Sequence, residues 1–117
     1  MAERMVLLIS GDVSTRSHLR ARLVEEGCQV FSFQSIRDAC HWTHLGGRVP
    51  SMVVIDIWRD DTYLKDLGWL KDLSDRSPVL FIAGHRDQIP SGLEAFGEIL
   101  RRPVSVGEIV SRIRSRV

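Results

Sequence analysis

The sequence predicts an α/β fold with a doubly wound, five-stranded parallel sheet and helices on both faces. Five short apolar runs alternate along the chain with longer amphipathic segments, which is the pattern of repeated strand–helix units. The runs are continuously apolar rather than alternating, as is typical of strands buried on both faces of a parallel sheet. Since parallel strands are joined by right-handed crossovers, the expected architecture is a three-layer sandwich.

The five predicted strands share a composition rich in Val, Ile, Leu and Phe. In chain order they are residues 5–9, 30–33, 52–57, 79–83 and 98–100.

The first two predicted helices have recognisable ends. The first spans 14–26, where Leu19 and Leu23 lie four residues apart on one face and Gly27 is a C-terminal stop. The second spans 35–45, from a capping-type serine to a pair of glycines.

The three later connections differ in strength. A helix over 62–73 carries leucine at helical spacing. The next connection is weak because Pro90 and Gly92 interrupt it, and 91–96 has room for about two helical turns. The last helix begins with a capping box, Ser-Val-Gly-Glu at 105–108, followed by one apolar face.

The composition predicts one globular domain over 1–117, and we expect no output domain in this chain. Hydrophobic residues make up 44% of the 117 residues and charged residues 26%, both close to the averages for globular proteins. A net charge of +1 gives no large single-sign field, so neither nucleic acid nor a membrane is expected as a partner. The two cysteines, Cys28 and Cys40, form no disulfide framework, so a reducing cytoplasm is the expected location.

A carboxylate ends the most hydrophobic predicted strand. Asp56 follows Val53, Val54 and Ile55, and a charge placed there needs a partner because burying it alone is costly. Arg102 follows the fifth predicted strand, and the carboxyl ends of parallel strands meet at one edge of the sheet. A helix cap or a loop anchor is the ordinary alternative role for such an aspartate.

This ordered set of elements and strand-end residues resembles the receiver domain of two-component response regulators, the CheY-like domains. The resemblance covers almost the whole chain and implies a flavodoxin-like (βα)5 fold and a role in phosphorelay signal transduction. In that family an aspartate ending the third strand accepts a phosphoryl group from a histidine kinase, and Asp56 stands at that position. The implied partners are proteins: a histidine kinase, a phosphotransfer or output protein, or a second copy of the chain.

The positions that bind metal in the family differ here. The family has an acidic pair after the first strand that holds Mg²⁺ together with the acceptor aspartate. Ser10 and Gly11 stand at those positions, and Asp12 comes one residue late. Asp12 and Asp56 are therefore only a weak Mg²⁺ pair, and we expect no resident cofactor.

The switch positions implied by the resemblance also differ. Ala83 stands where the family has Thr or Ser, and Ile99 stands where it has an aromatic residue. Arg102 replaces a lysine, which keeps the positive charge but changes its geometry.

Three residues near these strand ends are candidate contacts with a partner. Trp58 and Arg59 follow Asp56 directly, and Arg101 precedes Arg102. A tryptophan at a surface often anchors an interface, although Trp58 could equally pack on its own helix.

A second cluster, Cys40, His41 and His44, lies at helical spacing. A structural zinc site needs four ligands and no fourth is apparent, so the favoured interpretation is a core cysteine with surface histidines.

We therefore favour a pseudo-receiver that acts through protein–protein contacts and is not an enzyme, since no catalytic motif is present. One alternative is a functional receiver that is phosphorylated on Asp56. A second alternative is a flavin- or phosphate-binding domain of the same fold class, because residues 10–15 loosely match a phosphate loop at a helix N-terminus.

Overall fold

The five predicted strands form one parallel sheet in the order β2-β1-β3-β4-β5. The computed structural model describes residues 4–46, 49–57, 67–84, 92–102 and 105–116. The strands are β1 (Met5–Ile9), β2 (Gln29–Phe33), β3 (Met52–Ile57), β4 (Val79–Ala83) and β5 (Glu98–Arg101). The doubly wound fold class is confirmed.

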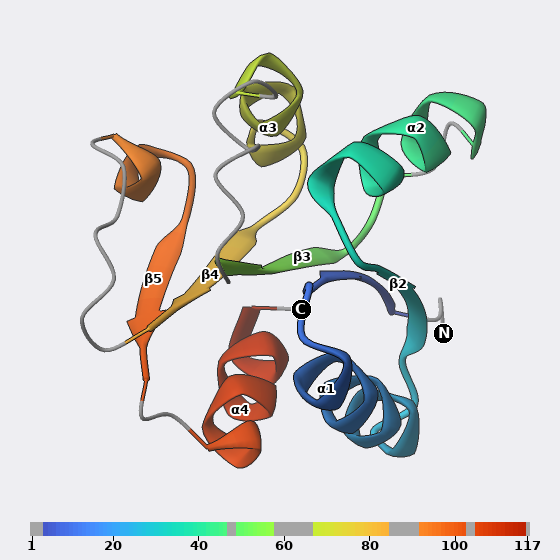
Figure 1. The fold of residues 1–117 in the computed structure, drawn as a ribbon, viewed down its shortest axis with the longest axis vertical. Coiled ribbons are helices and arrows are strands. Elements are labelled where there is room, and N and C mark those ends of the chain that lie inside the picture. The colour runs from blue at the N-terminus through green and yellow to red at the C-terminus, as the bar shows by residue number, and fades with distance from the viewer. Residues whose placement is uncertain (1–3, 47–48, 58–66, 85–91, 103–104, 117) are drawn as a thin grey trace.

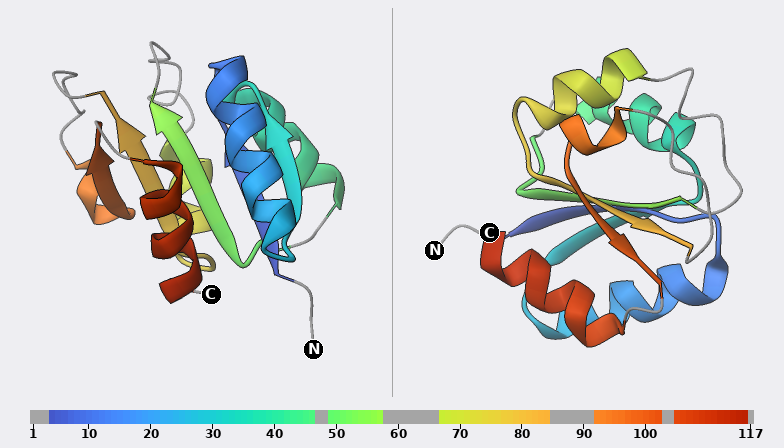
Figure 2. Two further views of the ribbon diagram at one scale, coloured as in Figure 1. Left: turned by 90° about the horizontal axis from the view of Figure 1, so that it is seen from below. Right: turned by 90° about the vertical axis from the view of Figure 1, so that its left-hand side faces the viewer.

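The helices lie on both faces of this sheet (Figures 1 and 2). They are α1 (Val13–Glu25), α2 (Ile36–Gly46), α3 (Leu67–Ser74) and α4 (Val106–Arg116), with a short 3₁₀ helix, η2 (Leu93–Ala95). Helices α1 and α4 cover one face, while α2, α3 and η2 cover the other.

Strand alternation divides the apolar residues between two cores, one on each face of the sheet. In β1, Leu7 and Ile9 join the core under α2 and α3, whereas Val6 and Leu8 join the core under α1 and α4. All of β1, β3 and β4 is buried, which is why β1 and β4 are unbroken apolar runs and β3 is interrupted only by Asp56.

Each predicted helix end that lies among the described residues of α1, α2, α3 and α4 agrees with the observed end within one residue. Helix α1 begins one residue early because Asp12 is its N-cap, and Gly27 follows it with φ +88°. The predicted helix over 62–73 is described only from Leu67, since 58–66 lie outside the described residues.

The prediction of about two helical turns over 91–96 is wrong, because the helical segment there is shorter. The described part of this connection is the single 3₁₀ turn of η2, which starts after Gly92 at φ +94°. Gly97 then passes so close to β4 that a Cβ there would lie 2.1 Å from the carbonyl oxygen of Val79. The chain thus turns back onto β4 directly after η2, so no helical turn can follow Phe96 there.

Within the described ranges, no helix combines the length and the apolar character that crossing a bilayer requires.

Candidate functional site

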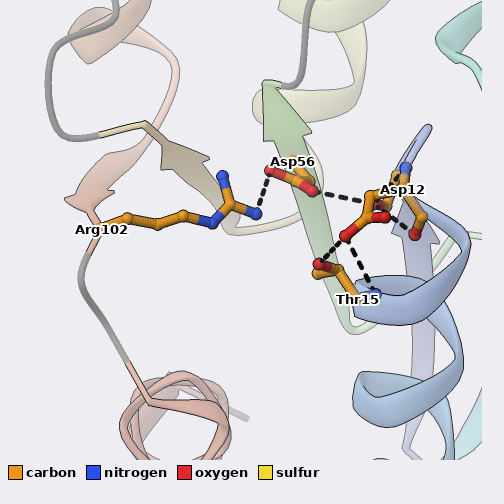
Figure 3. Close-up of polar contacts among 5 residues, drawn as sticks. Asp12, Thr15, Asp56 and Arg102 are labelled. Atoms are coloured by element: carbon orange, nitrogen blue, oxygen red, sulfur yellow. Dashed lines mark hydrogen bonds and ion pairs between the residues drawn. The ribbon is translucent and has the colours of Figure 1, made fainter.

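The carboxyl ends of β1, β3 and β5 bring together the residues singled out from the sequence. Asp56, in β3, is only 4% exposed. Its carboxylate oxygen Oδ1 lies 2.8 Å from Nη2 of Arg102, which follows β5. The Arg102 side chain is 25% exposed, so the pair lies at the boundary between core and surface (Figure 3).

Ser10 supplies the second contact of the same carboxylate. The Ser10 side chain is fully buried, and its hydroxyl donates to Oδ2 of Asp56 at 2.8 Å. That hydroxyl also accepts from the backbone N–H of Asp12 at 3.2 Å. Both oxygens of Asp56 are therefore engaged, one by a guanidinium and one by a hydroxyl, which offsets the cost of burying the charge.

Asp12 is the N-cap of α1. Its Oδ2 accepts from the backbone N–H of Thr15 at 3.3 Å and from the Thr15 hydroxyl at 2.5 Å. The hydrogen bond from the Thr15 hydroxyl is the main reason that the pKa of Asp12 lies below its ordinary value of 3.8. This carboxylate is thus already used by the first turn of α1 (Figure 3).

Backbone contacts fix the segments that carry these side chains. Arg16 donates from Nη1 to the carbonyl oxygen of Ser10 at 2.6 Å, which ties the start of α1 to the end of β1. The backbone N–H of Arg102 donates to the carbonyl oxygen of Ala83 at 2.8 Å, so Arg102 continues the line of β5 beside β4. The site is consequently built on strand ends rather than on loops.

The other residues named from the sequence lie around this cluster without joining it. Gly11 is exposed, Ala83 is fully buried, and Ile99 is half-buried against the core under α2 and α3. Arg101 is exposed and donates to the carbonyl oxygen of Gly84 at 3.4 Å. Trp58 and Arg59 lie outside the described residues.

The donor set around Asp56 does not fit Mg²⁺ in this arrangement. Magnesium takes oxygen ligands, and one or two carboxylates usually supply them together with waters. Here Asp56 has both oxygens in hydrogen bonds, Asp12 caps α1, and the positive charge beside Asp56 is the Arg102 guanidinium. Over the described ranges, His, Cys, Asp and Glu nowhere gather in a group of three that could hold a metal ion.

The residues on α2 split between core and surface. Cys40 is half-buried rather than fully in the core, and His41 is exposed, while the side chain of His44 lies outside the described part. Trp42 packs against Phe31, with ring centroids 4.7 Å apart.

Comparison with known proteins rests on structure. No protein-family model and no curated protein sequence matches the chain. A CheY-like response regulator receiver domain from Methanospirillum hungatei matches with a TM-score of 0.79 and 15% identity, over 98% of this chain and 95% of that one. The chain has the receiver fold. Chemotaxis protein CheY4 of Vibrio cholerae matches with a TM-score of 0.75 and 15% identity, over 99% and 100% of the two chains. The beryllofluoride-activated NtrC4 receiver domain dimer matches with a TM-score of 0.74 and 24% identity, over 96% and 94%.

Sequence reasoning missed two residues that shape this end of the receiver fold. From the sequence, Thr15 has a place only in the 10–15 segment and Arg16 has none, yet the first holds the Asp12 carboxylate and the second holds the end of β1. The spacing of Asp12 and Thr15, three residues apart at a helix start, is a capping signal that could have identified Thr15. No sequence signal marks Arg16, because its partner is a backbone carbonyl.

Proposed function

We propose that this chain is a receiver-fold signalling module that acts through contact with another protein, and that Asp56 ties strand ends together instead of accepting a phosphoryl group. One observation carries the proposal: both oxygens of Asp56 are engaged, by Arg102 on one side and by Ser10 on the other. The partner is expected among the proteins of phosphorelay signalling: a histidine kinase, a phosphotransfer protein or an output protein.

The chemistry of phosphoryl transfer supports this proposal. Attack by a carboxylate on a phosphoryl group brings two anions together, and a bound metal ordinarily offsets that charge. Ser10 and Gly11 add no carboxylate at the end of β1, and Asp12 is bound to Thr15. To react, Asp56 would have to leave both Arg102 and Ser10 and recruit a metal at a place where it has no second carboxylate.

Phosphorylation of Asp56 remains the rival function, and the position of this residue at the end of β3 favours it. The phosphate-loop alternative has less support, because the Asp12 carboxylate already occupies the N-terminus of α1, where an anion would bind.

Beryllofluoride, a stable mimic of the phosphoryl group, separates these functions. Amide chemical shifts of the ¹⁵N-labelled chain are followed while Mg²⁺ and then beryllofluoride are added, with Asp56→Asn as the matched control. Shifts unchanged at the ends of β1, β3 and β4 support the proposal. Saturable shifts there that are absent in Asp56→Asn would establish Asp56 as a phospho-acceptor.

A further inference from the structure

We draw no further inference here: the strongest candidate, the surface patch formed by the outer edge of β2 and the side of α1 that exposes Val13, Arg20 and Val24, carries nothing because nothing in the described structure shows what covers it.

Discussion

The guanidinium of Arg102 reaches the carboxylate of Asp56 at 2.8 Å, although the two residues are 46 positions apart in sequence. In the sheet, β4 lies between the strands that carry them, and the small side chain of Ala83 ends that strand. The ion pair therefore bridges three strand ends and links β3 to the segment that leads into α4.

Replacing Arg102 should expose how much Asp56 depends on it. Arg102→Ala leaves the buried carboxylate with Ser10 alone, and we expect the free energy of unfolding to fall by about 2 kcal/mol, since Arg102 is itself partly exposed. Arg101→Ala is the matched control, with an expected change below about 0.5 kcal/mol. Urea denaturation measures both, and equal losses would contradict a specific role for Arg102.

Ser10 should matter for stability although it is a small residue. Ser10→Ala removes the donor to Oδ2 of Asp56 and leaves a buried carboxylate oxygen unsatisfied, at a cost of about 1–3 kcal/mol. Ser14→Ala, at an exposed site on α1, should cost less than about 0.5 kcal/mol. If Ser10→Ala left the free energy of unfolding unchanged in urea denaturation, the hydrogen bond to Asp56 would not contribute to stability.

Ser10→Asp should create a dependence on Mg²⁺. The substitution sets a second carboxylate against Asp56, so the two like charges should lower the melting temperature, and Mg²⁺ should restore it because it prefers carboxylate oxygens. Ser10→Asn, which adds no charge, should not respond. Thermal unfolding with and without Mg²⁺ checks both; a Mg²⁺ response in the unmodified chain would contradict the assignment of the site.

The cap of α1 should give stability that depends on acid. The pKa of Asp12 is lowered chiefly by the Thr15 hydroxyl, so the ionised form is favoured by folding. This stabilisation is complete above the ordinary pKa of 3.8 and is lost as the pH falls through the lowered value. Thr15→Val should therefore lower the melting temperature at neutral pH, with a difference from the unmodified chain that shrinks in strong acid. A difference in melting temperature that does not change with pH would show that the effect of Thr15→Val does not depend on the ionisation of Asp12.

The close approach of Gly97 to β4 should make that glycine irreplaceable. Gly97→Ala would put Cβ 2.1 Å from the carbonyl oxygen of Val79. This substitution should lower the free energy of unfolding by about 2–4 kcal/mol. Gly68→Ala in α3 meets no atom within 4 Å and should stabilise the chain by about 0.5–1 kcal/mol. Similar effects of the two substitutions in urea denaturation would show that the contact is not tight.

The strands and most helix ends could be predicted because the signals for them are local. An unbroken apolar run such as 79–83 marks a strand buried on both faces, and Gly27 marks the end of α1. The end of η2 could not be predicted, because the close approach that follows it joins Gly97 to Val79, which is distant in sequence.

The residues of the candidate site could be predicted from the sequence, but the hydrogen bonds between them could not. The sequence places Asp56, Ser10 and Arg102 at strand ends, and the order of the strands then brings them to one edge. In the structure, the Ser10 hydroxyl binds one oxygen of Asp56 and the Arg102 guanidinium binds the other. These contacts depend on the directions of the side chains in the packed sheet, which no sequence pattern encodes.

Intact mass after incubation with acetyl phosphate and Mg²⁺ tests most directly whether Asp56 is an anchor or an acceptor. Asp56→Asn is measured in parallel, and the beryllofluoride titration accounts for a phosphoryl group that is lost quickly. We expect no gain in mass in either chain. A gain of one phosphoryl group that is present in the unmodified chain and absent in Asp56→Asn would contradict the proposed function.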